Sequence, residues 1–144
     1  MRILILGGAG FVGPHIAGQL AALGHLVWLY HRGKGERRAE SSPSIRHIYA
    51  DLDSLRDFRD ALRQLHFDTV IHMLAMTRDD ARAAATVFNG FTGRLIVAYS
   101  QDVYAAFGVL LKKETHSGDA PQRITESDPL RSARYIRGDD YEKI

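Results

Sequence analysis

The chain contains no cysteine, and this absence narrows the chemistry that its 144 residues can carry. Disulfides, thiolate zinc sites and cysteine nucleophiles are all excluded. No apolar run approaches the ~18 residues that a membrane-spanning helix needs. The apolar run Ile3–Leu6 near the N-terminus is also too short for the core of a signal peptide. We therefore expect a cytoplasmic protein.

Strong charge and metal-ligand patterns are missing as well. The net charge of +2 is too small to indicate a nucleic-acid-binding protein, although the sequence pI of about 9.0 keeps that alternative open. The seven histidines lack the i,i+4 or carboxylate-paired spacing of a metal site, so we predict no bound metal. His72 lies in an apolar segment and is expected to be buried and hydrogen-bonded. His31 and His47 are expected in a loop or at a strand edge.

Glycine, by contrast, is concentrated in one segment, Gly7–Gly13, which directly follows the apolar run Arg2–Leu6. The glycines at 8, 10 and 13 fit G-x-G-x-x-G, and those at 7, 10 and 13 fit G-x-x-G-x-x-G. Both patterns allow a tight turn, close approach of a ligand to the backbone, and close packing of a helix on a strand. Backbone N–H groups and a helix N-terminus then meet at one point, which suits the pyrophosphate of NAD or NADP. The alternative is an ordinary glycine-rich turn without a ligand.

The segment after this turn has the pattern of a helix. Ile16, Leu20 and Leu23 recur at 4,3 spacing and predict one apolar face. Pro14 falls in the first helical turn, where its missing N–H costs little. Gly24 is the expected C-terminal stop. Strand, glycine turn and helix therefore follow one another as a dinucleotide site requires.

Strand and helix patterns alternate along the chain. Apolar runs typical of strands buried on both faces of a parallel sheet occupy residues 2–6, 26–30, 45–49, 69–74 and 94–99. Helices are expected over 54–65, with Asp53 as N-cap, and over 79–89, where Asp79 and Asp80 complement the helix dipole. The alternation predicts an α/β fold: a doubly wound parallel sheet in a three-layer α/β/α arrangement, with strand order 3-2-1-4-5. We expect residues 1–144 to form one dinucleotide-binding domain.

The end of the second expected strand indicates which dinucleotide is bound. NAD-binding versions of this fold carry an acid about twenty residues after the glycines, which binds the ribose hydroxyls. Here Arg32 occupies that place, and the first acid is Glu36. A guanidinium there can bind the 2′-phosphate of NADP, and Lys34, Arg37 and Arg38 can add positive charge. One charge-assisted contact, worth roughly 1.5–3 kcal/mol, is enough for a tenfold preference for NADP over NAD. The alternative is a solvated basic loop that binds no ligand.

Two further segments are expected to line the cofactor. Asp51 and Leu52 follow the third strand, where the carboxylate can accept from the adenine amino group and the next N–H faces the ring. The alternative for Asp51 is a helix-capping role. Leu74 and Ala75 end the fourth strand and should pass near the cofactor, because ligands of such sheets bind at the carboxyl ends of the strands.

Five segments occur in an order and spacing shared with a known family: Gly7–Gly13, Asp51-Leu52, Val70–Ala75, Ser100–Tyr104 and Thr125–Leu130. Together they resemble the extended or atypical short-chain dehydrogenases/reductases, which include the NAD(P)-dependent sugar-nucleotide epimerases and dehydratases. The resemblance covers nearly the whole chain. It implies an NAD(P)-binding Rossmann fold and hydride transfer on a sugar-nucleotide-like or other small carbonyl or hydroxyl substrate. The short apolar runs predict no membrane partner, and the small net charge disfavours a nucleic-acid partner.

The resemblance also implies catalytic residues, because members of this family use a serine or threonine, a tyrosine and a lysine. The serine hydrogen-bonds the substrate, the tyrosine passes a proton, and the lysine lowers the pKa of the tyrosine and holds the nicotinamide ribose. Ser100, Tyr135 and Lys143 are the candidates for these roles. However, the tyrosine and lysine should be four residues apart on one helix face. Asp139 stands at the lysine position for Tyr135, and Tyr141 lies only two residues before Lys143.

Family members continue well beyond the point at which this chain stops, with a lobe that binds the sugar. The chain is therefore expected to be the cofactor-binding half, truncated before the substrate-binding lobe, with exposed apolar edges that favour a homo-oligomer. Two functions stay open: an enzyme of the epimerase, dehydratase or reductase type, and a non-catalytic NADP-binding sensor or regulatory module. A nucleic-acid-binding relative that uses the basic loop 32–38 is a third alternative.

Overall fold

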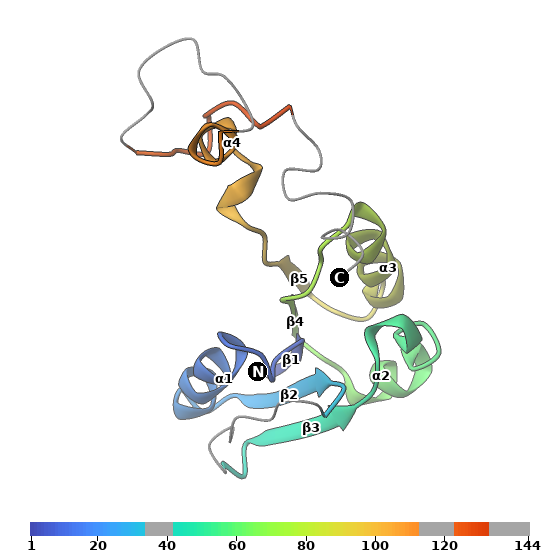
Figure 1. Cartoon of the computed structure of the whole chain (residues 1–144). Coiled ribbons are helices and arrows are strands. Elements are labelled where there is room, and N and C mark those ends of the chain that lie inside the picture. Colours follow the sequence, from blue (N-terminus) through green and yellow to red (C-terminus); the bar gives the residue numbers. More distant parts are fainter. Residues whose placement is uncertain (34–41, 113–122, 133–144) are drawn as a thin grey trace. The chain divides into compact units, whose positions relative to one another are not determined.

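A computed structural model describes residues 1–33, 42–112 and 123–132, apart from the side chain of Gln101. The chain divides into two compact units, Met1–Ala98 and Tyr99–Ile144. Figure 1 shows the strands and three of the helices in the first unit, and helix α4 (Ala105–Leu110) in the second. Each unit is described by itself.

The first unit is built on a five-stranded parallel sheet. Its strands lie in the order β3-β2-β1-β4-β5, which confirms the order expected from the sequence. Leu4 of the central strand lies opposite Trp28 on one side and Val70 on the other. The strands are β1 (Arg2–Leu6), β2 (Leu26–His31), β3 (Ile45–Tyr49), β4 (Thr69–His72) and β5 (Arg94–Val97).

Helices cover both faces of this sheet, because successive residues of a strand point to opposite sides. Leu4 and Leu6 of β1 belong to a core that also includes residues of α2 (Arg59–Leu65) and α3 (Arg78–Phe88). Ile3 and Ile5 pack on the other face, with Ala17 of α1 (Gly13–Ala22). In Figure 1, α1 accordingly lies across the sheet from α2. The expected three-layer α/β/α arrangement is confirmed.

The helix expected over 54–65 begins later than its apolar pattern indicated. Residues Leu52–Ser54 form a 3-10 helix, and α2 starts only at Arg59. Asp51 is the N-cap of this 3-10 helix, because its carboxylate accepts a hydrogen bond from the Asp53 N–H at 3.4 Å, whereas the N-cap of α2 is Phe58, which makes no side-chain capping bond. The prediction of Asp53 as N-cap was therefore wrong: the chain first forms a 3-10 turn capped by Asp51, and α2 begins later without a capping side chain.

The buried face of α1 also differs from its predicted stripe. Leu23 is 72% exposed and follows the helix as its C-cap, whereas Gly13 and Ala17 are the buried helical residues. Ile16 and Leu20 pack at the margin of this core. The small residues Gly13 and Ala17 thus form the most buried part of α1, with Ile16 and Leu20 packed beside them.

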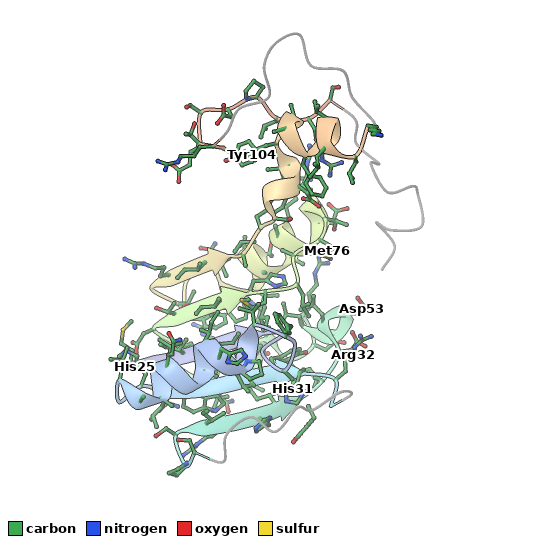
Figure 2. All side chains as sticks on the ribbon, turned by 60° about the vertical axis from the view of Figure 1, so that its left-hand side comes forward. His25, His31, Arg32, Asp53, Met76 and Tyr104 are labelled. Carbon is green, nitrogen blue, oxygen red and sulfur yellow. The ribbon has the colours of Figure 1, made fainter. Side chains whose placement is uncertain are left out.

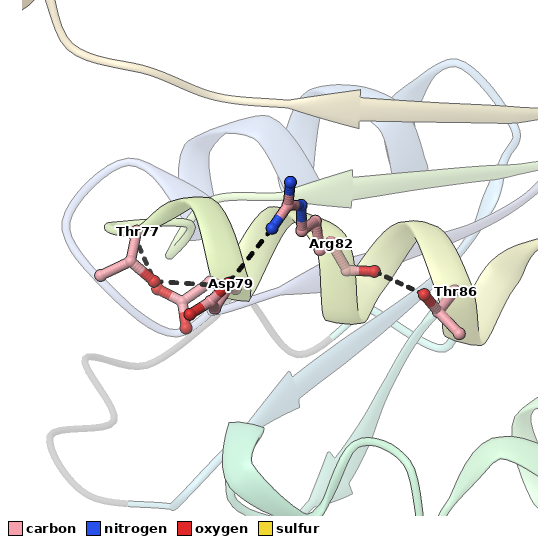
Figure 3. Close-up of polar contacts among 5 residues, drawn as sticks. Thr77, Asp79, Arg82 and Thr86 are labelled. Carbon is pink, nitrogen blue, oxygen red and sulfur yellow. Dashed lines mark hydrogen bonds and ion pairs between the residues drawn. The ribbon is translucent and has the colours of Figure 1, made fainter.

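Helix α3 begins with a complete set of local contacts, which Figure 3 shows. The Thr77 side chain accepts from the Asp80 N–H at 3.2 Å, and the Asp80 carboxylate accepts from the Thr77 N–H at 2.9 Å. Asp79 pairs with Arg82 at 3.9 Å one turn later. The acidic start that the sequence indicated is thus a capping box, which satisfies the first N–H groups of the helix.

The second unit joins a short helical stretch to a distant segment. The described part contains a 3-10 helix (Gln101–Val103), helix α4 and residues 123–132. Tyr104 and Leu130 form an antiparallel bridge, and the Ala105 N–H donates to the Pro129 carbonyl at 2.9 Å. The segment Thr125–Leu130 that the sequence singled out is therefore tied to the start of α4. Among the described helices of the chain, none is long and apolar enough to cross a bilayer.

Candidate dinucleotide site

The turn between β1 and α1 assigns a separate role to each of three glycines. Gly7 has a φ of +81°, which side chains with a Cβ rarely adopt, and makes the tight turn. A Cβ on Gly13 would lie 2.3 Å from the Gly8 carbonyl oxygen, so Gly13 permits the close approach of α1. A Cβ on Gly10 would meet only the Gly7 oxygen, at 3.6 Å, and Gly10 is exposed. Gly10 is therefore the open position. A Cβ on Gly8 would lie 2.6 Å from Leu29 Cδ2, so Gly8 also makes room for the packed core, and the structure is compatible with both glycine spacings.

The N-terminus of α1 differs from that of α3 in a way that suits an anion. Its N-cap, Val12, makes no side-chain capping bond, and its first turn contains no acid. Phe11 and Val12 are 79% and 48% exposed, so the approach to this helix end is lined by apolar side chains that face solvent. N–H groups without a capping side chain and the positive end of a helix dipole favour a phosphate group.

Arg32 lies directly after β2 and is exposed. Figure 2 shows it at the end of the sheet that also carries Asp53. The three other basic residues considered for a 2′-phosphate, Lys34, Arg37 and Arg38, lie outside the described residues. Arg32 is thus a described cation directly after β2, and its contact with the nucleotide ribose stays a prediction.

His31 was expected in a loop or at a strand edge, and this was wrong. It is the last residue of β2 and only 7% of it is exposed. The ring is accommodated because its Nδ1 accepts from the Gly33 N–H at 3.2 Å and its Nε2 lies 2.8 Å from Nδ1 of His47. His47 lies on the edge strand β3, as expected, and is exposed.

Asp51 and Leu52 follow β3 and are fixed by a side chain of the neighbouring strand. The Tyr30 hydroxyl donates to the Asp51 carbonyl oxygen at 2.8 Å, and the Ser54 hydroxyl donates to the same oxygen at 2.7 Å. Burial raises the pKa of Tyr30, so its phenol stays protonated and remains a donor. The Asp51 carboxylate caps the 3-10 helix, and the residue is exposed. Its contact with adenine stays a prediction.

Leu74 and Ala75 follow β4, and Leu74 packs over the glycine turn. An added Cβ on Gly7 would lie 2.4 Å from Leu74 Cγ, so the glycine makes room for this side chain. Leu74 is 45% exposed and Ala75 is buried. The strand ends at His72 because the Leu74 N–H turns back to donate to His72 Nδ1 at 3.3 Å. His72 is fully buried and hydrogen-bonded, as the sequence predicted.

Acidification should destabilise the protein through His72. Burial lowers the pKa of this imidazole from 6.5, and the charge of Asp80 only partly opposes the shift. The unfolded chain therefore binds the proton first, so the free energy of unfolding should be largest above about pH 6.5 and should fall as the pH drops towards the folded-state pKa. Urea unfolding between about pH 7.5 and 5.5 measures this loss. The variant His72→Asn keeps an acceptor for the Leu74 N–H and should weaken the pH dependence; an unaltered dependence would contradict the assignment.

The predicted cofactor residues converge on one edge of one sheet. Gly7–Gly13, Arg32, Asp51-Leu52 and Leu74-Ala75 follow β1, β2, β3 and β4, and these strands are parallel neighbours. Their carboxyl ends therefore meet at the same edge, where ligands of such sheets bind. All of these residues belong to the first unit.

The candidate catalytic residues belong to the second unit. Ser100 is exposed, and its hydroxyl oxygen accepts from the Asp102 N–H at 3.3 Å at the start of the 3-10 helix. Tyr135 and Lys143 lie outside the described residues, as do Asp139 and Tyr141. Their catalytic roles stay predictions. In the part of the chain that the structure describes, no group of three or more His, Asp or Glu side chains is placed to hold a metal.

Sequence reasoning missed the side chains that support the site. These are Tyr30, which fixes Asp51, and the pair His47 and Tyr49, which contacts His31 across the strands. The alternation His47-x-Tyr49 on an expected strand was a usable signal, because it places both side chains on one face. The register between β2 and β3, which brings that face against His31, could not be predicted from the sequence.

A hollow of about 490 Å³ lies elsewhere in the first unit, between residues 66–68 and 90–93. These residues precede β4 and β5, so the hollow is at the amino ends of the strands. It belongs to the edge opposite the glycine turn and is not part of the candidate site.

Comparisons with known proteins agree with this arrangement. One solved structure with this fold is the Bordetella bronchiseptica enzyme WbmG in complex with NAD, at 18% identity and a TM-score of 0.68, covering 90% of this chain and 43% of that chain. A UDP-galactose 4-epimerase matches at 22% identity and a TM-score of 0.64, covering 91% of this chain and 45% of that chain. A yeast methylglyoxal/isovaleraldehyde reductase complexed with NADPH matches at 15% and 0.59, covering 72% and 39%.

The chain thus spans less than half the length of these solved structures. A search of the curated proteins finds no matching sequence. The sequence model of the NAD dependent epimerase/dehydratase family, however, matches residues 3–95, which include most of β1, all of β2 to β4 and every predicted cofactor residue. Because this match covers more than half of the 144 residues, the chain belongs to the NAD-dependent epimerase/dehydratase family.

Proposed function

We propose that the chain is the cofactor-binding part of an enzyme of the epimerase, dehydratase or reductase type, and that it binds NADP more tightly than NAD. The observation that carries the proposal is the turn Gly7–Gly13, with an open backbone at Gly10 and an uncapped helix N-terminus beside it. The remaining contacts come from Asp51, Leu52, Leu74 and Ala75 along the same sheet edge. The whole of residues 1–144 is proposed as one functional module whose substrate-binding lobe lies outside them.

The cofactor preference is proposed from this chain's own residues. The structure of the Bordetella enzyme contains NAD and that of the yeast reductase contains NADPH, so proteins with this fold bind either nucleotide. Arg32 places a positive charge after β2, where a carboxylate would select NAD. The exposed guanidinium can form a bidentate contact with the 2′-phosphate of NADP.

The proposed substrate is a small carbonyl or hydroxyl compound of the sugar-nucleotide type. The Bordetella enzyme has also been solved with UDP beside NAD, which supports this class. The bound nicotinamide would supply the chemistry of accepting or donating hydride. Ser100 is proposed to hydrogen-bond the reacting oxygen, Tyr135 to transfer its proton, and Lys143 to lower the pKa of the tyrosine.

Replacing Ser100 or Lys143 by alanine should lower turnover of sugar nucleotides by at least about a hundredfold. Ser100 is proposed to hydrogen-bond the reacting oxygen and Lys143 to lower the pKa of the tyrosine, so each change removes a group that assists proton transfer. The measurement is nicotinamide absorbance with a panel of UDP- and dTDP-hexoses, on the full protein. Thr86→Ala, an exposed change on α3, is the matched control. NADPH affinity should be unchanged in Ser100→Ala and in the control Thr86→Ala, whereas Lys143→Ala also removes the proposed contact with the nicotinamide ribose. Turnover retained in both Ser100→Ala and Lys143→Ala would remove these residues from the mechanism.

A second function is favoured by the spacing of the candidate tyrosine and lysine. Tyr135 and Lys143 are not four residues apart, so an intact pair on one helix face is missing from the sequence. A non-catalytic NADP-binding sensor or regulatory module accounts for this. Such a protein binds NADPH with the same preference and shows no turnover with any substrate of the panel, which separates the two functions.

A further inference from the structure

We infer that His31 is a positioning residue for recognition of the NADP 2′-phosphate, and that His47 holds the His31 ring in the tautomer that this role needs. The inference rests on the proposed function, since it concerns the same nucleotide site. Arg32 is the residue proposed to contact the phosphate. His31 would act through it, by fixing the backbone turn that carries it.

The turn after β2 is held by contacts on two sides. The Gly33 N–H donates to His31 Nδ1 at 3.2 Å, so the chain folds back on the side chain that ends the strand. Gly33 has a φ of +75°, and an added Cβ would lie 3.2 Å from the Tyr49 ring. The ring of Tyr49 also meets that of His31 edge-on, with centroids 5.0 Å apart. Arg32 therefore stands on a backbone with a defined conformation, although its own side chain is exposed.

The hydrogen bonds assign one tautomer to each imidazole. A neutral imidazole has one N–H donor and one acceptor nitrogen. Because His31 Nδ1 accepts from Gly33, the ring proton of His31 is on Nε2, which lies 2.8 Å from His47 Nδ1. His47 Nδ1 is then the acceptor, and its own proton is on Nε2. The ring of Tyr49 stacks on His47 at 14° and supports it from one side.

The end of β4 shows the same turn without the second imidazole. The Leu74 N–H donates to His72 Nδ1 at 3.3 Å, again between residues two apart. The Nε2 of His72 has no hydrogen-bond partner among the described residues, whereas that of His31 is joined to His47. A histidine can therefore close a strand-ending turn alone. The additional hydrogen bond to His47 on β3 fixes the His31 ring beside Arg32. The turn after β2, unlike the one after β4, carries a charged side chain (Figure 2).

A fixed turn reduces the conformational entropy that is lost when Arg32 becomes ordered on a bound phosphate. A histidine that only filled space at the end of β2 would affect the fold and both nucleotides equally. A positioning residue acts on the contact that NADPH makes and NADH lacks. The ratio of the two affinities therefore separates positioning from a purely structural role.

The test uses the 144-residue chain and titrates the fluorescence of NADPH and of NADH. The variant His31→Gln keeps the size and polarity of the side chain but moves the acceptor away from Gly33, and should weaken NADPH binding about fivefold. NADH binding should change by less than about twofold. The variant His31→Asn places its Oδ1 where Nδ1 was, as in an Asx turn, and should restore NADPH binding.

Changes at His47 provide a second test that does not disturb the core, because this residue is exposed. The variant His47→Ala should weaken NADPH binding about threefold, and His47→Asn, which retains an acceptor for His31, should restore it. Nitrogen NMR of the imidazoles should show His31 protonated at Nε2 in the unmodified chain. In His47→Ala the same ring should populate both tautomers.

Three outcomes would overturn the inference. His31→Gln and His47→Ala could bind NADPH as the unmodified chain does, or they could lose NADPH and NADH affinity in equal proportion. Either result leaves the proposed function intact. An unmodified chain that binds neither nucleotide would instead overturn the proposed function, and this inference with it.

Discussion

The substitution Gly10→Ala should weaken binding of NADPH and NADH at least tenfold while leaving the stability of the fold unchanged. The added methyl group would meet only the Gly7 oxygen, at 3.6 Å, which is an ordinary contact. It would project from the open part of the turn, where the backbone must approach the pyrophosphate. Displacing one charge-assisted hydrogen bond there, worth roughly 1.5–3 kcal/mol, accounts for a ten- to hundredfold loss. Calorimetric titration with each nucleotide measures it.

The variant Gly13→Ala is the comparison for Gly10→Ala, because it should lower the stability of the fold. Its methyl group would lie 2.3 Å from the Gly8 carbonyl oxygen, so backbone must move, and the free energy of unfolding should fall by about 1–3 kcal/mol. Gln19→Ala, on the exposed side of α1, should alter neither quantity. Substitution of Gly10 is thus expected to affect nucleotide affinity, and substitution of Gly13 to affect the free energy of unfolding. Full nucleotide affinity in a well-folded Gly10→Ala variant would show that the pyrophosphate binds elsewhere.

NADPH should bind at least tenfold more tightly than NADH, and Arg32→Ala should abolish the difference by weakening NADPH alone. The reason is the position of the guanidinium directly after β2, where the 2′ position of the adenosine ribose is proposed to lie. The difference between the NADPH and NADH affinities should also become smaller at high salt, because the Arg32 guanidinium and the 2′-phosphate are exposed charges that salt screens. Paired fluorescence titrations at low and high ionic strength measure both effects.

The matched control for this second prediction is Arg82→Ala, which removes an exposed arginine from α3 and leaves the charge of the chain the same as in Arg32→Ala. It should leave the NADPH preference intact. Equal affinities for the two nucleotides in the unmodified chain would end the proposed preference, and the basic segment after β2 would then be a solvated loop.

The sequence predicted the architecture because that information is local. The aliphatic runs of β1, β2 and β4 identify buried parallel strands, whereas the edge strands β3 and β5 are partly exposed. The order of the strands follows from general rules of connection. The glycine turn could be predicted for the same reason. Gly7 is needed for its positive φ and Gly13 for the close approach to Gly8, and both requirements arise within a few residues.

The errors arose where contacts distant in sequence decide the outcome. His31 is buried because β3 supplies His47 and Tyr49, and this pairing depends on the register of two strands. Leu23 is exposed because α1 approaches the sheet through Gly13 and Ala17, which periodicity alone ranks below a leucine. Asp53 does not cap α2 because the chain forms a 3-10 turn, capped by Asp51, before the helix begins at Arg59.

The amides of the turn Gly7–Gly13 are proposed to bind the pyrophosphate of a dinucleotide, and every other proposal for this protein depends on that contact. The most direct measurement is an NMR titration of the ¹⁵N-labelled chain with NADPH. Saturable shifts should be largest for the amides of this turn, with smaller ones at Arg32, Leu52 and Leu74. Absence of saturable shifts, or shifts confined to the hollow between residues 66–68 and 90–93, would contradict the account.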